Sequence, residues 1–287
     1  IICTDPSGEL LETIGGYAKQ QGYEVRVFNL VNPSRSDSWN LTAEVGTDQT
    51  LAQICTQTII DNTTNGKSDA FYDNGEKNLL KALLLYMNSP QYTTNDKSIG
   101  ELYKMLTGDN FKGTLETINQ LSEDHPAKIP YNIFAAAPNN VQESFHSGLA
   151  IRLQILQSPA IRDMLSGVGN PMELTAPAKR KCAYFIAMSD QDSTFQLASS
   201  LFFSFLFIDL AAFGKTQPNQ DLPVHINVVL DELPSIGQIP DLGRKMATVR
   251  KYGVNVFPIV QMVSQLDNRY SEAERDEIIG CCDTQIW

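Results

Sequence analysis

The first part of the chain alternates between short apolar runs and a segment with polar helix signals. The apolar run 1–4 is followed by Asp5-Pro6, and Asp before Pro suits a helix N-cap and the first helical position. We therefore predict a helix from about Pro6 to Gln21, ended by Gly22. Residues 24–30 then alternate as a strand does. Strand, helix and strand in this order predict a right-handed βαβ unit.

The same alternation resumes after residue 180. We predict strands over 182–188, 225–230, 254–260 and 284–287, and helices over 193–213, 240–251 and 271–279. The run Val228-Val229-Leu230 is typical of a strand in the interior of a parallel sheet, covered on both faces. An α/β fold, with a parallel sheet flanked by helices, is expected from this order.

The middle of the chain has a different period. Apolar residues recur at helical spacing in 49–60, 78–87 and 140–156, with no convincing strand between them. Turn signals such as Ser89-Pro90 separate these segments. We therefore expect an all-α domain at 45–150, inserted into an α/β domain whose two parts are 1–44 and 151–287.

Composition narrows the class of protein. The 287 residues are 42% hydrophobic and 19% charged, which is typical of a folded chain with a sizeable core. The net charge is −11 and the pI is near 4.7. Because Lys and Arg supply most non-specific affinity for nucleic acid, this chain is not expected to wrap nucleic acid by itself, although a local basic pore is compatible with the totals.

Cysteine and histidine usage indicates a reduced compartment and no metal site. The five cysteines include an adjacent pair, Cys281-Cys282, and none has C-x-x-C spacing. This pattern favours an intracellular protein with free thiols. The three histidines lie far apart in the sequence, so no metal site is indicated.

No membrane span or signal peptide is predicted. The apolar stretch Leu201–Phe213 is too short to span a bilayer and contains Ser204 and Asp209, so we interpret it as a buried core helix. The chain begins at Ile1 and stops at Trp287, each inside an apolar run. We therefore expect a fragment of a longer protein, cut within strands at both ends.

The strongest chemical signal is Asp231-Glu232 at the end of an apolar strand. Carboxylates there lie at the carboxyl edge of the sheet, where α/β proteins bind ligands. In a P-loop ATPase such an Asp holds the magnesium shell and the adjacent Glu activates the attacking water. A strand that simply ends in an acidic turn is the alternative, and the motif alone does not separate the two.

Two further residues follow that strand. Gln261 ends the next strand along the chain, so it is expected near the acidic pair, either contacting the γ-phosphate or a water, or capping the following helix. Arg250 ends the intervening helix. Its position by itself favours a structural role, in which the cation complements the dipole at the helix C-terminus. The alternative is a catalytic role, as an arginine finger that reaches a neighbouring subunit's phosphate.

A phosphate-binding loop is missing from the sequence. Gly66-Lys67-Ser68 and Gly214-Lys215-Thr216 match only the last three positions of G-x-x-x-x-G-K-[ST], because Asp61 and Asp209 stand where the first glycine is required. Both are interpreted as surface turns. An ATPase is therefore expected only if the loop lies upstream of Ile1.

An ordered set of motifs resembles the conjugative coupling proteins of type IV secretion systems. Asp5-Pro6-Ser7-Gly8-Glu9 is similar to the family's D-P-K-G-E, with Ser7 in place of Lys, and Trp39-Asn40-Leu41 to its W-N-P, with Leu41 in place of Pro. The remaining similar segments are 71–80 of the all-α domain and the motor motifs 229–232, 239–242, 250–253 and 261–266.

The resemblance implies a RecA-like P-loop NTPase core in a membrane-anchored homo-hexameric ATPase. It implies ATP and Mg²⁺ as cofactors, with Asp231 in the magnesium role, Glu232 as catalytic base, Gln261 as phosphate sensor and Arg250 as finger. Expected partners are relaxase and relaxosome proteins, transferred single-stranded DNA or protein effectors, and secretion-channel components. The parent is expected at the cytoplasmic face of the cell membrane, held by an N-terminal segment missing here, while this fragment is expected to be inactive and to bind no nucleotide tightly.

Two alternatives remain open. One is another hexameric translocase of the same superfamily, such as a chromosome pump, which the inserted all-α domain and the Asp5-Pro6 segment disfavour. The other is a non-catalytic docking module whose acidic helical domain recruits substrate proteins.

Overall fold

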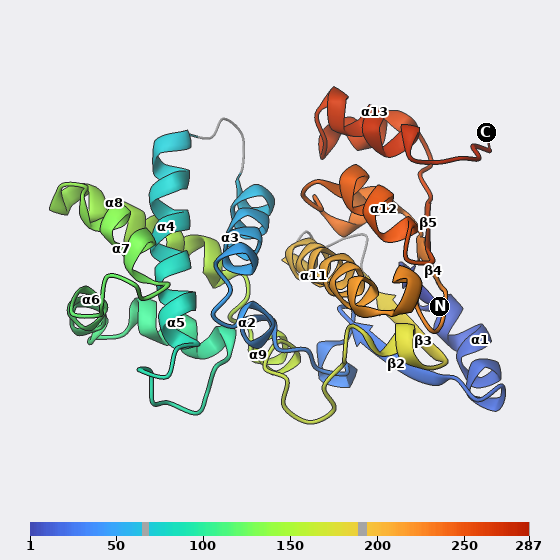
Figure 1. Ribbon diagram of the computed structural model, residues 1–287, viewed down its shortest axis with the longest axis horizontal. Helices are drawn as coiled ribbons and strands as arrows, with labels where there is room; N and C mark the ends of the chain where they lie inside the picture. The colour runs from blue at the N-terminus through green and yellow to red at the C-terminus, as the bar shows by residue number, and fades with distance from the viewer. Residues whose placement is uncertain (65–68, 189–193, 287) are drawn as a thin grey trace. The chain divides into compact units, whose positions relative to one another are not determined.

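The computed structural model describes residues 1–64, 69–188 and 194–286 (Figure 1). The chain forms two units: Ile1–Asp37 with Met172–Trp287, and Ser38–Pro171. The predicted all-α segment 45–150 lies inside the second unit, which also takes in residues on both sides of it. Trp39 shows why, because it is fully buried and its backbone N–H donates to the carbonyl of Met164, 2.7 Å away.

The first unit is built on a five-stranded parallel sheet in the order β2-β3-β1-β4-β5. Its strands are β1 (Ile2–Asp5), β2 (Glu24–Asn29), β3 (Cys182–Ala187), β4 (Ile226–Leu230) and β5 (Val254–Pro258). The first and last parts of the chain therefore share one sheet, since β1 pairs with both β3 and β4. The predicted strand at 284–287 is wrong for Thr284–Ile286, which are exposed and form no strand, and Trp287 lies outside the described residues.

Helices cover both faces of this sheet. Helix α1 (Glu9–Gln20) packs on the face that carries Cys3, Ala183 and Phe185. Helix α11 (Thr194–Thr216) packs on the opposite face, where Phe202 stacks on Phe28 with ring centroids 4.9 Å apart. Helix α12 (Leu242–Arg250) lies beside α11 and β5.

The prediction that β4 is covered on both faces holds for Val229, which packs with the cluster on the α1 face, but not for Asn227. Asn227 is exposed and Val229 is only half-buried, whereas Ile226, Val228 and Leu230 are buried. Successive side chains of a strand point to opposite faces, and α1 packs over β1, β2 and β3. The face toward α11 and α12 therefore holds the core at β4.

The first helix begins later than predicted. Helix α1 starts at Glu9, and its N-cap is Gly8 at φ 77°, so Pro6 is not its first residue. Asp5 still caps the helix, because its carboxylate accepts hydrogen bonds from the N–H groups of Leu10 (3.2 Å) and Leu11 (2.9 Å). The turn Pro6–Gly8 lets the buried side chain of Asp5 reach back to these free N–H groups. The predicted stop at Gly22 is confirmed by its φ of 81°.

Helix α11 is the longest apolar helix. Its segment Phe195–Thr216 is long and apolar enough to cross a membrane by composition alone, but 72% of its most apolar window is buried inside the protein. Phe202, Phe203 and Leu206 are fully buried. This burial agrees with the prediction of a core helix.

The second unit is helical throughout its described residues, apart from one isolated bridge between Ser38 and Pro171. Its helices are α2 (Leu41–Val45), α3 (Gln49–Thr63), α4 (Ala70–Met87), α5 (Ile99–Thr107), α6 (Phe111–Asn119), α7 (Lys128–Ala135), α8 (Asn139–Gln154) and α9 (Pro159–Met164). Helix α4 is the centre of the unit and packs against α3, α5, α7 and α8. Side-chain caps start five of them: Asn40 at α2, Asp48 at α3, Asp69 at α4, Ser98 at α5 and Ser158 at α9.

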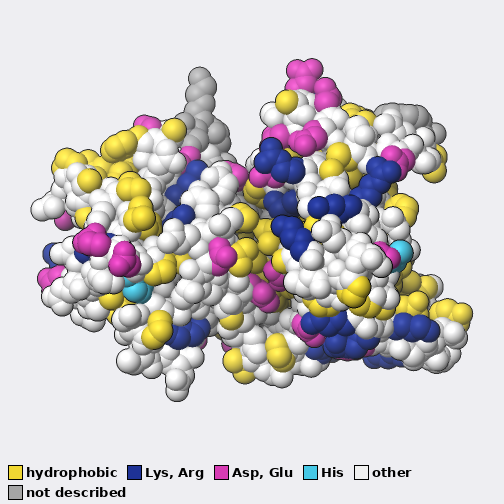
Figure 2. All heavy atoms as spheres, in the orientation of Figure 1, with side chains coloured by type: hydrophobic (Ala, Val, Ile, Leu, Met, Phe, Trp, Pro, Cys, Tyr) yellow, Lys and Arg dark blue, Asp and Glu magenta, His cyan; other side chains and the backbone are white. Residues whose placement is uncertain are grey.

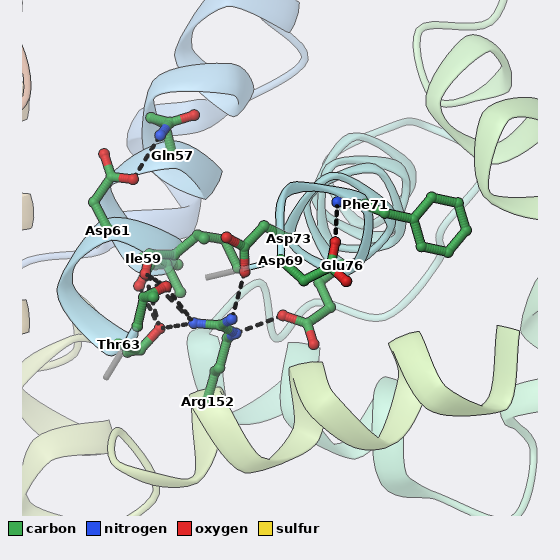
Figure 3. Close-up of polar contacts among 11 residues, drawn as sticks. Gln57, Ile59, Asp61, Thr63, Asp69, Phe71, Asp73, Glu76 and Arg152 are labelled. Atoms are coloured by element: carbon green, nitrogen blue, oxygen red, sulfur yellow. Dashed lines mark hydrogen bonds and ion pairs between the residues drawn. The ribbon is translucent and has the colours of Figure 1, made fainter. Parts of the chain in front are cut away.

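A charged cluster joins three of these helices (Figure 3). The guanidinium of Arg152 on α8 pairs with Glu76 Oε2 (2.5 Å) and Asp73 Oδ1 (2.6 Å) on α4. It also donates to the hydroxyls of Thr63 (3.1 Å) and Thr64 (2.9 Å) at the end of α3. The side chains of Arg152, Asp73 and Glu76 are 16%, 12% and 7% exposed, so the cluster is largely removed from water.

The remaining elements complete the first unit. They are α10 (Ala176–Lys179), α13 (Glu272–Gly280) and the 3₁₀ turns η1 (Pro33–Arg35), η2 (Pro218–Gln220), η3 (Leu233–Ile236) and η4 (Val263–Asn268). Helix α13 packs against α12, and η3 and η4 follow β4 and β5 at the carboxyl edge of the sheet.

Candidate site at the carboxyl edge of β4 and β5

The acidic pair lies where β4 leaves the sheet. Asp231 and Glu232 follow the last strand residue, Leu230, and both are half-buried. The hydroxyl of Thr4 on the neighbouring β1 donates to the Asp231 carbonyl at 2.7 Å. Glu232 adopts the left-handed conformation, with φ 55° and ψ 52°. The backbone is thus held on one side by β1 and turns sharply at the glutamate.

The structure brings Gln261 to this pair. Strands β4 and β5 are adjacent, as their connection predicts, and the Gln261 side-chain amide donates to Glu232 Oε1 at 3.0 Å. Gln261 lies three residues beyond the end of β5 rather than on its last residue. Its own backbone N–H donates to Gln265 Oε1 (3.2 Å), which also accepts from Met262 N–H (3.2 Å). Gln265 therefore holds the turn that carries the amide.

Arg250 is engaged elsewhere. It is the last residue of α12, and its guanidinium forms a two-point ion pair with Asp283, with Nη1–Oδ1 3.1 Å and Nη2–Oδ2 2.8 Å. The two side chains are 62% and 70% exposed. A surface pair of this kind contributes about 0–1 kcal/mol, so the guanidinium can exchange to another anion at little cost.

A set of polar residues pins the loop between Glu232 and α12. Ser199 donates to the carbonyl of Ile236 (2.7 Å), and Ser200 donates to that of Gln238. The hydroxyl of Tyr270 accepts from Ile239 N–H at 3.2 Å, and burial raises the pKa of Tyr270, which keeps the phenol neutral. Sequence analysis missed these contacts. The adjacent pair Ser199-Ser200 inside an apolar helix was the only available signal.

Arg269 supports the same loop from η4. Its guanidinium donates to the Pro234 carbonyl (3.3 Å) and to Gln196 Oε1 of α11 (2.6 Å). The loop after the acidic pair is therefore tied both to the helix on the sheet and to the segment that follows β5. This arrangement limits how far Glu232 can move relative to Gln261.

The two glycine-lysine segments are not phosphate loops in the part that can be described. Gly214-Lys215-Thr216 forms the last turn of α11 and not the surface turn that was predicted, and a Cβ at Gly214 would lie 2.6 Å from the Tyr252 ring. Glycine is required there by close packing. Gly66-Lys67-Ser68 lies outside the described residues.

The donor set fits one side of a nucleotide site. The Glu232 carboxylate and the Gln261 amide meet at the sheet edge, and Asp231 precedes Glu232 in the chain; oxygen donors of this kind suit a hydrated Mg²⁺ and a water molecule. Among the described residues, no three His, Cys, Asp or Glu side chains cluster to hold a metal by themselves. A metal at this edge therefore needs additional oxygen ligands, of the kind that nucleotide phosphates supply.

A match to a family model shows which protein family this chain belongs to. The model for type IV secretory system conjugative DNA transfer matches residues 1–286. The chain belongs to this family. Its members are the conjugative coupling proteins to which the ordered motifs were similar, so the resemblance is confirmed.

Solved coupling-protein structures share the fold. The unbound bacterial conjugative coupling protein TrwBdeltaN70 matches with a TM-score of 0.68 and 16% identity, over 98% of this chain and 60% of that one. TrwB with ADP and Mg²⁺ gives the same TM-score, identity and coverage. TrwB with the non-hydrolysable ATP analogue ADPNP gives 0.65 and 16% over 98% and 62%.

The similarity to these structures establishes the fold of this chain. The first unit is a RecA-like P-loop NTPase fold with a five-stranded parallel sheet and flanking helices, as predicted. The chain spans about 60% of the length of the TrwB structures named above. None of the curated proteins compared matches this sequence.

Proposed function

We propose that this chain is the cytoplasmic part of a coupling protein that hydrolyses ATP to drive conjugative transfer. The observation that carries the proposal is the 3.0 Å contact between Glu232 and Gln261 at the carboxyl edge of adjacent parallel strands. Nucleotide binding by the related TrwB and the family membership support it. A strand that merely ended in an acidic turn would not need an amide from the next strand aimed at its carboxylate.

The residues take distinct roles in this proposal. Asp231 orders the water shell of Mg²⁺, and Glu232 accepts a proton from the attacking water. Bound ATP and Mg²⁺ supply the phosphoanhydride bond and the cation that neutralises the phosphates. Gln261 orients the Glu232 carboxylate through its amide N–H, which leaves its Oε1 to accept from water.

Arg250 acts from a neighbouring subunit in a homo-hexamer. Its exposed guanidinium is already arranged for two-point binding of an anion, here Asp283. A phosphate on an adjoining subunit also offers two oxygens that can accept from one guanidinium. The finger role therefore requires Arg250 to exchange Asp283 for phosphate.

The test uses the longer coupling protein that contains this chain. Glu232→Gln and Asp231→Ala are expected to abolish ATP hydrolysis and DNA transfer, a loss of at least 10²-fold. Both variants are expected to keep the circular dichroism spectrum and oligomeric state of the parent, because neither side chain is part of the core. Asp109→Ala, an exposed acid of the helical unit, is the matched control. Parental turnover in Glu232→Gln would falsify the base assignment.

A docking role for the helical unit is the second candidate function. It would recruit relaxase, other relaxosome proteins or protein effectors, and so bring cargo to the channel. Exposed apolar residues favour it: Ile129 and Ile133 are 60% and 55% exposed and share one face of α7, being one helical turn apart. Figure 2 shows several hydrophobic patches over the helical unit. Exposed apolar surface of this kind is typical of protein contacts.

Binding of purified relaxosome proteins separates this role from the motor role. We expect the whole 287-residue chain to retain a relaxosome protein in a pull-down, and Ile129→Ser with Ile133→Ser to reduce retention at least tenfold. Ile14→Ser, an exposed isoleucine of α1, serves as the control. Equal retention by the double variant and the parent chain would argue against docking through α7. In the longer coupling protein, Glu232→Gln is expected to lose hydrolysis and to keep retention, which would show that the two roles are separate.

A further inference from the structure

A cavity of about 440 Å³ lies between α1 and the outer edge of β2, away from the acidic pair. One wall is formed by Leu11, Gly15 and Lys19, which recur every four residues on one face of α1. Val25 and Val27 of β2 form a second, apolar wall. Arg35 and the two residues after it close the third side.

The two glycines of α1 are not explained by the fold. Gly15 and Gly16 both lie inside the helix without a positive φ, and each costs about 1 kcal/mol of helix stability relative to Ala. A Cβ at Gly16 would meet no atom within 4 Å, and one at Gly15 would meet only the flexible Leu11 side chain at 3.0 Å. Glycine is therefore not required by close packing at either position. Larger side chains there would instead fill the cavity.

The cavity carries positive charge that is not used internally. Neither the Lys19 ammonium nor the Arg35 guanidinium forms an ion pair or side-chain hydrogen bond with any residue in the described ranges. The one acid in the lining, Asp37, is already engaged by Arg26 Nη1 (3.2 Å) and the Val27 N–H (2.7 Å). The lining thus offers two cations and a satisfied carboxylate.

An added strand is not the natural occupant. Asp37 N–H donates to the Val27 carbonyl (2.8 Å), and Ser36 Oγ accepts from Asn29 N–H (2.8 Å), so the chain itself covers much of the free edge of β2. The opening that remains suits a small molecule. Its lining is mostly polar, so the two cations can hold an anionic group while the small apolar part formed by Val25 and Val27 contacts the rest of the molecule.

We propose that this cavity binds a small phosphorylated molecule, with its phosphate between Lys19 and Arg35. Lys19 contributes a flexible point charge, and Arg35 a planar group that can bind two phosphate oxygens at once. The organic part would lie over the glycine face of α1 and against Val25 and Val27. This site is separate from the β4–β5 edge, and the proposal does not depend on ATP hydrolysis there.

Calorimetric titration of the 287-residue chain with inorganic pyrophosphate tests the site. We expect saturable binding that weakens at least tenfold in Lys19→Gln and in Arg35→Gln, and that is lost in Gly16→Leu, which fills the cavity. Leucine is a better helix former than glycine, so Gly16→Leu is expected to unfold at a temperature no lower than the parent chain. Lys112→Gln in the helical unit and Glu232→Gln at the edge site are expected to bind like the parent.

Three outcomes would overturn the proposal. They are the absence of saturable pyrophosphate binding, unchanged affinity in both charge variants, and undiminished binding in a folded Gly16→Leu chain. Citrate that binds more tightly than pyrophosphate would replace the phosphate assignment with a carboxylate one. Weakening by Glu232→Gln alone would assign the binding to the β4–β5 edge instead.

Discussion

Glu232 combines a chemical role with a strained backbone. Its left-handed conformation costs a residue with a Cβ about 1–2 kcal/mol, and glycine pays little of this. Three hydrogen bonds hold it there: Leu233 N–H to the Ile259 carbonyl (3.0 Å), Ser235 N–H to the Glu232 carbonyl (2.8 Å), and the Gln261 contact. Strain of this kind is found at functional sites, where surrounding contacts over-determine the conformation.

The strain predicts an unusual order of stabilities at this position. Glu232→Gly is expected to have a free energy of unfolding about 1 kcal/mol higher than Glu232→Ala, because glycine removes the clash of the left-handed conformation. Urea denaturation of the 287-residue chain measures the difference. The same pair of substitutions at Glu12, in the regular helix α1, is the control and is expected to give the opposite order. Alanine more stable than glycine at position 232 would contradict the assigned conformation.

Among the elements, the Arg152 cluster is the main polar connection of the helical unit. One guanidinium joins α8 to two acids of α4 and two hydroxyls at the end of α3 (Figure 3). Burial raises the pKa of Glu76, and the charge of Arg152 acts in the opposite direction. The acids are tolerated in a largely dry position because the arginine is present.

Removing the arginine is therefore expected to be costly. Arg152→Met keeps much of the side-chain volume but leaves Asp73 and Glu76 without their cation, and we expect a loss of about 3–5 kcal/mol in the free energy of unfolding. Chemical denaturation followed by helical circular dichroism measures it. The matched control is Lys104→Met, because the Lys104 side chain is 64% exposed and Glu101 keeps its hydrogen bond from Tyr92; the expected change is below about 1 kcal/mol. A similar small change for both variants would show that the cluster contributes little.

For the whole molecule, we predict that hydrolysis requires a phosphate-binding loop in addition to these 287 residues. No G-x-x-x-x-G-K-[ST] motif is present, and a backbone amide cradle with its Lys normally holds the β- and γ-phosphates. We expect the 287-residue chain to show no ATP hydrolysis above background in a phosphate-release assay. The longer coupling protein is the positive control. Turnover by the 287-residue chain that disappears in Glu232→Gln would refute this expectation.

Much of the fold could be predicted from local patterns. Periodicity predicts the buried strands and their intervening helices within a few residues, and the expected adjacency of β4 and β5 predicts that Gln261 lies beside Glu232. Errors arose where local signals compete. Asp5-Pro6 imitates a helix start, although Asp5 caps α1 from a turn further back. The segment 284–286 is predicted as a strand, although no described strand pairs with it.

The sequence by itself determined the class of fold, the family and the chemical identity of the edge residues, because periodicity, strand order and motif spacing are local properties of the chain. Only the tertiary structure decided which distant side chains meet. Arg152 lies 76 and 79 residues from its two acids, and Ser199 lies 37 residues from the carbonyl that it holds. Such contacts depend on how whole elements pack, and no local pattern encodes that packing. For the same reason, the ion pair of Arg250 with Asp283 and the cavity between α1 and β2 could be found only in the tertiary structure.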